Sequence, residues 1–304
     1  NNINYQTDKF ITNTGIANNF NIYLKNLNSL GKKNADYKSS PQMELVSIFS
    51  ANTSFPLIKK QQKYTDYLTP KLSLRFNPSD MKDYSDSGKT IDVGNVFSIT
   101  RLGLGDTFES GRSLTLGLDY KRENKELEGI NNFFEMKLAT VIRDKEESFV
   151  PKKSTINRKT SNIFGSITKQ YSDIFSLDYD FSIDNDLNTF ERNSIGTTFK
   201  LNNIVTTFNF TEENGIMGDT NVFRTKISYN IDNNNFIKFQ TRRNRKINLT
   251  EYYDLVYEYK NDCLTAAIEY KKTFYDDIDL DPDENIFFSI TIIPFGSINS
   301  PNLK

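Results

Sequence analysis

The stretch NVFSITRLGLGDTFESGRSLTLGLDYK, residues 95–121, places four charged side chains among glycines: Arg101, Asp106, Glu109 and Arg112. Two are cations and two are anions at neutral pH, and they stand ahead of a strand-like alternation. An ion pair between Arg101 and either Asp106 or Glu109 is therefore expected. The stretch raises three chemical possibilities, namely a phosphate loop, a catalytic site and a polar segment that folds into an enclosed space.

The first two possibilities fail on residue type. A phosphate loop needs a Lys-Ser/Thr pair that opens a helix, and neither follows GLGDTFESG. A catalytic site would need a base partner or a cluster of metal ligands, and the stretch has neither. A solvated loop remains open. The favoured interpretation is a long extracellular link that folds inward, either as a structural plug or to shape a substrate cavity.

The absence of histidine excludes further chemistry. With no His, the chain forms no Ser-His-Asp triad, no His-based zinc site and no His general base. A single Cys excludes an internal disulfide and CxxC metal sites. We expect a protein that is not an enzyme and that has no cofactor.

Two other charged groups remain ambiguous. An acidic link near the C-terminus contains Asp277, Asp279 and Asp281, which are weak candidates for divalent cations and fit a solvated loop equally. The basic pairs Lys152–Lys153 and Arg242–Arg243 suit anionic sugars or phosphates, with a solvated surface as the alternative. No metal site is otherwise predicted.

Composition limits the partners. The 304 residues carry a net charge of −1, so no global field recruits nucleic acid. Mean hydropathy is negative, and no apolar run approaches the ~18 residues of a transmembrane helix. Aromatic residues are abundant, with 24 Phe and 16 Tyr.

Period-two alternation runs through the chain and predicts strands. In DIFSLDYDFSIDND, apolar residues from Phe175 to Ile183 alternate with Ser and Asp. Similar segments, about fourteen in all, begin near residues 15, 42, 64, 111, 130, 161, 173, 188, 203, 220, 235, 250, 263 and 285. Most are about ten to twelve residues long, which is the length that a tilted strand needs to cross a bilayer core, ~9–11 residues. Asp178, Asp180, Lys200, Glu258, Glu269 and Lys271 fall on the polar faces, by strand parity.

The connections alternate between tight turns and longer links, as in outer-membrane barrels. The tight turns are YSD (171–173), NN (202–203), DNNN (232–235) and KND (260–262). A soluble β-sandwich or propeller is the alternative, but the long, even strands and the lack of a blade repeat disfavour it. We expect an all-β, antiparallel transmembrane β-barrel, with about fourteen strands here.

Residues 68–121 resemble one outer-membrane family. LTPKLSLRFNP followed by the NVFS-x-x-R segment, the pair Gly105–Asp106, the Glu109-x-Gly111 motif and a strand ending at Tyr120 are similar to the LPS-assembly protein family, LptD. The resemblance covers essentially the whole chain, whose C-terminal half agrees in layout and ends in IIPFG.

The resemblance implies that residues 1–304 are the C-terminal portion of a larger barrel, about half of it. The N-terminal periplasmic jellyroll domain and the first barrel strands would be absent. It implies transport of lipopolysaccharide into the outer leaflet of a Gram-negative outer membrane. Its implied partners are lipopolysaccharide, outer-membrane lipids, the plug lipoprotein LptE and the periplasmic LPS-bridge proteins.

Two site assignments follow from the resemblance. A lateral seam would use the last strand, with Phe287, Ser289, Thr291 and Pro294, where proline cannot donate to a ladder. Cys263 would form a disulfide with a cysteine upstream of this chain; a small hydrophobic role is the alternative. A second functional hypothesis is an outer-membrane porin or specific diffusion channel, which predicts a complete barrel and a loop that narrows its lumen.

Overall fold

The chain forms one antiparallel β-sheet in the computed structural model, which describes residues 2–31, 40–125, 132–275, 281–293 and 296–299. Fourteen strands are long: β3 (Ala17–Ser29), β4 (Gln42–Ser54), β6 (Tyr64–Asn77), β7 (Gly111–Asn124), β8 (Phe133–Arg143), β9 (Ile163–Gln170), β10 (Phe175–Ile183), β11 (Phe190–Leu201), β12 (Ile204–Glu213), β13 (Thr220–Asn230), β14 (Asn235–Asn244), β15 (Leu249–Lys260), β16 (Leu264–Thr273) and β17 (Asp283–Ile292). Four are short: β1 (Asn2–Gln6), β2 (Phe10–Ile11), β5 (Leu57–Lys60) and β18 (Gly296–Asn299). The described helix η1 (Lys152–Ser154) is a single 3₁₀ turn.

The fourteen long strands are the fourteen alternating segments expected from the sequence. The expected all-β, antiparallel fold is confirmed, and a transmembrane β-barrel fits the curved sheet. The four short strands were not predicted, because pieces of two to five residues are too short to show a period. Within the described residues, no helix is long and apolar enough to cross a membrane.

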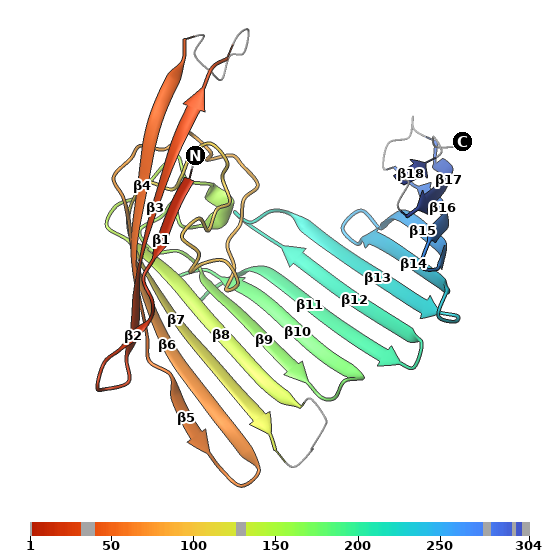
Figure 1. The fold of residues 1–304 in the computed structure, drawn as a ribbon, viewed down its shortest axis with the longest axis horizontal. Helices are drawn as coiled ribbons and strands as arrows, with labels where there is room; N and C mark the ends of the chain where they lie inside the picture. Colours follow the sequence, from red (N-terminus) through yellow and green to blue (C-terminus); the bar gives the residue numbers. More distant parts are fainter. Residues whose placement is uncertain (1, 32–39, 126–131, 276–280, 294–295, 300–304) are drawn as a thin grey trace.

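Each long strand pairs with the next long strand along the chain, so the sheet is a meander that curves around a central space (Figure 1). At one edge β1 and β2 both pair with β3, and at the other edge β18 pairs with β17. In the described part of the chain, no contact joins β17 or β18 to β1, β2 or β3, and the two edges stand apart.

The outward face is apolar and the inward face is polar. On β17 the exposed residues alternate with half-buried ones, and Ile286, Phe288 and Ile290 are each more than 40 % exposed. Exposing this much apolar surface to water would be unfavourable, whereas contact with the hydrocarbon chains of lipid removes that cost. The curved sheet therefore presents its apolar face to a membrane and its polar face to the interior.

Short turns lie at one end of the sheet and long links at the other, as the alternation of connections predicted. In the turn between β13 and β14, the Asp232 carboxylate accepts hydrogen bonds from the backbone N–H groups of Asn234 and Asn235, both at 2.8 Å. These bonds hold the pKa of Asp232 below its ordinary value. At the opposite end, residues 78–110 and 144–162 fold back onto the inner face of the sheet (Figure 1).

A hydrophobic core lies between those two folded segments and the sheet. Val96, Val150 and Ile156 from the segments are fully buried with Val141 of β8 and Phe164 of β9. This packing makes the segments part of the folded structure. They therefore occupy a defined place inside the curved sheet.

Candidate functional site

The inward segment, residues 78–110, begins and ends on two paired residues. Asn77 closes β6 and Gly111 opens β7, and the two face each other in the strand register. The buried Asn77 amide donates to the carbonyl oxygen of Glu109 at 2.9 Å and accepts from the backbone N–H of Ser79 at 2.9 Å. Gly111 has a φ of +82°, a conformation that glycine adopts without a Cβ penalty. The base of the segment is therefore fixed.

Arg101 and Glu109 form the centre of the segment. The Arg101 Nε donates to Glu109 Oε2 at 2.7 Å and its Nη2 donates to Oε1 at 2.5 Å, a bidentate pair. Arg101 also donates to the hydroxyls of Ser113 at 2.9 Å and Thr115 at 3.0 Å. Both hydroxyls lie on β7, so the pair connects the segment to the sheet.

Two further arginines of the sheet converge on Glu109. Arg75 of β6 donates from Nη1 to the Glu109 carbonyl at 2.9 Å and lies 3.7 Å from its carboxylate. Arg143 of β8 donates to Glu109 Oε1 and to the carbonyl oxygen of Ser110, both at 2.5 Å. We call Arg75, Arg101, Arg143 and Glu109 the arginine cluster; all four are buried.

Burial opposes the charged form of Glu109, but the attraction of Arg101, Arg75 and Arg143 outweighs it. The pKa of Glu109 is therefore held well below its ordinary range. One carboxylate faces three guanidinium groups, so its loss would leave buried cations without compensation.

An aromatic contact holds the apolar side of the segment. The Phe97 ring lies directly against Gly117 of β7, and a Cβ built on Gly117 would come within 2.5 Å of that ring. The Lys71 ammonium lies 5.7 Å from the centre of the same ring. Glycine at this inward position is what lets the ring approach the strand.

The other two predicted residues of the stretch lie apart from the arginine cluster. Asp106 pairs with Lys82 at 3.1 Å and accepts from the Tyr84 hydroxyl at 2.5 Å, near the surface. Arg112 differs from the prediction, because it points outward and its guanidinium lies 5.3 Å from the Phe76 ring centre. The alternation of β7 places residue 112 on the same face as Leu114, so strand parity carried the signal that would have corrected this assignment.

A hollow of about 490 Å³ lies beside the segment on the inner wall. Its charged lining comes from several strands: Lys71, Asp119, Lys137, Asp180 and Arg192, with Asp92 of the segment. Lys71 and Asp119 form an ion pair across β6 and β7. The interior beside the segment is therefore a polar, mixed-charge space.

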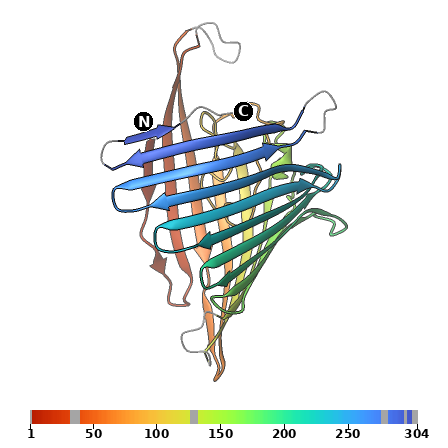
Figure 2. The same cartoon turned by 90° about the vertical axis from the view of Figure 1, so that its right-hand side faces the viewer.

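A group of inward-facing cations lies on β13 and β14 in the wall that Figure 2 presents. Arg224 stands directly opposite Arg242, and Lys226 and Lys238 lie along the same two strands. Arg242 pairs with Glu251 at 2.8 Å, whereas Arg224 and Lys226 make no ion pair with a carboxylate among the described residues. Among Arg224, Lys226, Lys238 and Arg242, only Arg242 was named from the sequence as a candidate for binding anions. The alternation in FRTKISYN would also have identified Arg224 and Lys226. We call these four residues the basic ladder.

The remaining predicted positions are scattered. Cys263 is exposed in the turn before β16, and its disulfide stays a prediction. Asp281 is exposed, Asp277 and Asp279 lie outside the described residues, and the described part of the chain contains no group of three metal-binding side chains.

The strand β17, which was expected from the sequence to be the last one, is followed by the short strand β18. Ser289 and Thr291 of β17 pair with β16 on one side and with β18 on the other, so they do not form a free edge. Phe287 pairs with Glu269 of β16, and Pro294 lies outside the described residues. The short β18 was not predicted because proline and glycine interrupt the pattern before it.

No family model and no curated protein matches the chain. The solved structures that match include porins of Rhodopseudomonas blastica, one a triple mutant with a TM-score of 0.38 and 10 % identity. A second blastica porin mutant has a TM-score of 0.39 and 11 % identity. A third structure, described as "Asymmetric conductivity of engineered proteins", has a TM-score of 0.39 and 11 % identity. Each alignment covers 93 % of this chain and 92 % of the other.

The resemblance of residues 68–121 to the LPS-assembly protein family is wrong, and so is the lipopolysaccharide-transport function taken from it. Porins are among the matching structures, and no comparison supports that family. The residues behind the resemblance have a local structural role. Arg101 and Glu109 anchor the segment to the wall, and Gly117 accommodates Phe97.

Proposed function

We propose that the protein is a diffusion channel of the porin type in the outer membrane of a Gram-negative bacterium. The observation that carries this proposal is the inward segment, held against the inner wall by the buried arginine cluster. A segment fixed in this way narrows the interior and stays in place as solutes pass.

The polar inner face supports the same proposal. The mixed charges around the 490 Å³ hollow and the basic ladder supply a hydrated lining for small solutes. An apolar outer face keeps the sheet in lipid. The proposal assigns solute passage to these charges and no catalytic role.

Backbone groups at a sheet edge in lipid must find partners. The proposal therefore requires that the two edges, at β1–β3 and at β17–β18, become paired in the membrane-inserted protein. A closed ring is what separates the lumen from lipid.

The test is conductance. Purified protein added to a planar lipid bilayer should produce discrete current steps at fixed voltage, with a linear current–voltage relation at low voltage. Heat-modifiable electrophoretic migration and protease protection should verify insertion in the same preparation. Inserted protein that gives no conductance, and no solute-driven swelling of liposomes, would reject the channel function.

A further inference from the structure

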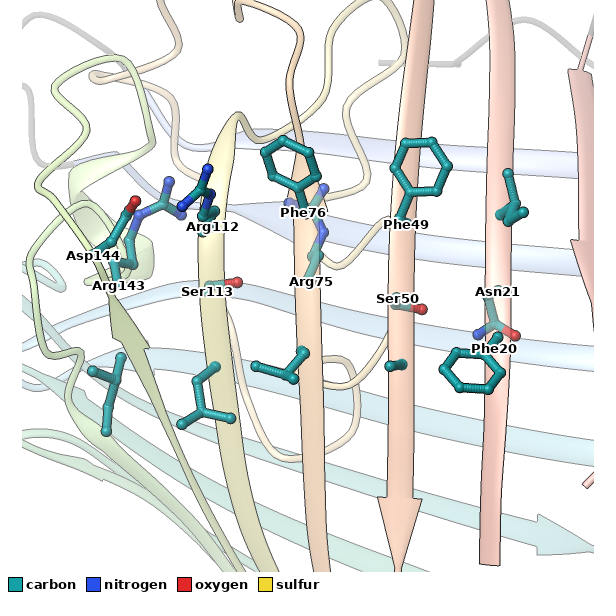
Figure 3. A pocket seen from close by; sticks show the side chains of 15 residues that line it. Phe20, Asn21, Phe49, Ser50, Arg75, Phe76, Arg112, Ser113, Arg143 and Asp144 are labelled. Carbon is teal, nitrogen blue, oxygen red and sulfur yellow. The ribbon is translucent and has the colours of Figure 1, made fainter. Parts of the chain in front are cut away.

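An apolar groove of about 850 Å³ lies on the outward face of the sheet, over β3, β4, β6, β7 and β8 (Figure 3). Its floor follows one row of the strand register, in which Phe20, Ala51, Leu74, Leu114 and Ile142 are successive partners. Most of the surface exposed inside the groove is apolar.

Ala51 is the reason for the hollow. It is the smallest residue of the row and stands between Phe20 and Leu74, which are both about half exposed. In the adjacent row, Phe49 and Phe76 pair across β4 and β6 with stacked rings 6.5 Å apart. A methyl side chain among aromatic neighbours leaves a recess that water would fill poorly.

The groove has a cationic end. Arg112 is the partner of Phe76 in the register and lies over its ring, at the end of the sheet where the two long inward segments start. Arg112 is exposed, and no carboxylate pairs with it among the described residues. Asp144 also lines this end and contributes an opposing charge.

We propose that this groove is a lipid-binding site that holds one acyl chain of a phosphate-bearing diacyl lipid, with the phosphate on Arg112. An apolar recess in the membrane-facing surface selects a hydrocarbon chain, and the Arg112 guanidinium, which pairs with no carboxylate among the described residues, complements a phosphate with two parallel hydrogen bonds. Asp144 weakens the headgroup contact. The site depends on the membrane fold and is independent of the proposed channel function.

The experiment is native mass spectrometry of the detergent-solubilised protein titrated with phosphatidylglycerol or with uncharged diacylglycerol of the same chains. We expect one adduct at low lipid concentration, with phosphatidylglycerol preferred. Arg112→Gln should lower phosphatidylglycerol affinity about tenfold, because a charge-assisted phosphate contact is lost. It should also remove the preference over diacylglycerol. Asp144→Asn should strengthen phosphatidylglycerol binding.

Filling the groove tests the acyl chain separately. Ala51→Phe should abolish the one-to-one adduct for both lipids, because the ring occupies the recess. Ala266→Phe is the matched control, since Ala266 lies on the outward face of β16 beside Ile290 and away from the groove. Heat-modifiable migration should show that every variant folds. Equal binding by the two phenylalanine variants, or an unchanged lipid preference in Arg112→Gln, would overturn the proposal.

Discussion

Glu109 contacts the guanidinium groups of Arg75, Arg101 and Arg143 in a place without access to water. Glu109→Gln should destabilise the protein by ~3–5 kcal/mol, because it leaves buried cations with one fewer counter-charge. Chemical unfolding and limited proteolysis within residues 78–110 measure the effect. Asp106→Asn, at a partly exposed pair with Lys82, is the control and should cost ~0–1 kcal/mol.

Acid should release the same contact. The folded-state pKa of Glu109 lies below the ordinary value of 4.5, so the unfolded chain takes up its proton first as pH falls. The contribution of Glu109 to stability is therefore fully present above about pH 4.5 and is lost as pH falls through the folded-state pKa. Proteolysis of the segment by an acid-stable protease should stay low at pH 5 and rise below that range. In Glu109→Gln this part of the pH dependence should vanish; its persistence would assign the effect to another group.

At the scale of the element, β7 and the inward segment meet through Gly117 and Phe97. Gly117→Val should displace Phe97, because the added side chain would occupy the space of the ring. Under the channel proposal, single-channel conductance should rise as the segment moves from the lumen. Gly88→Val is a control in the same segment, since a Cβ there meets nothing within 4 Å. Unchanged conductance in Gly117→Val would mean that the segment does not narrow the conducting path.

The basic ladder belongs to a pair of elements, because β13 and β14 each supply two of its four cations. Arg224 and Arg242 stand directly opposite each other, an arrangement that favours an anion between them. Arg224→Glu should shift the reversal potential in a potassium chloride gradient toward cation selectivity. Heat-modifiable migration equal to that of the parent excludes an insertion defect in this variant. A reversal potential identical to that of the parent would remove the ladder from the conducting path.

At the scale of the whole molecule, one face of the sheet is in lipid and the other is not. Leu255 of β15 is 44 % exposed on the outward face, and Val256 is the next residue on the inward face. Leu255→Arg should cost ~2–4 kcal/mol if it lies near the membrane midplane, whereas Val256→Arg should be tolerated. Refolding into lipid vesicles at graded urea measures both. If Val256→Arg is the more damaging variant, the assignment of the two faces is inverted.

The two sheet edges also belong to this scale. Unpaired strand edges are costly in lipid, so each edge needs a partner in the membrane. The idea that the first strands of a larger barrel and a periplasmic domain lie outside residues 1–304 is not tested by the fold and stays a prediction.

Alternation determined the fourteen long strands and which side chains share a face, and the tight turns between them determined the antiparallel class, because both are local properties of the chain. Closeness in sequence also indicated an ion pair of Arg101 with Asp106 or Glu109, and the structure shows Glu109, eight residues away, as the partner. Only the tertiary structure decided that Arg75 and Arg143, both 34 residues from Glu109, complete the cluster. The groove around Ala51 likewise exists only because five strands align in one register. Register is set by pairings between distant segments, and no local pattern contains that information.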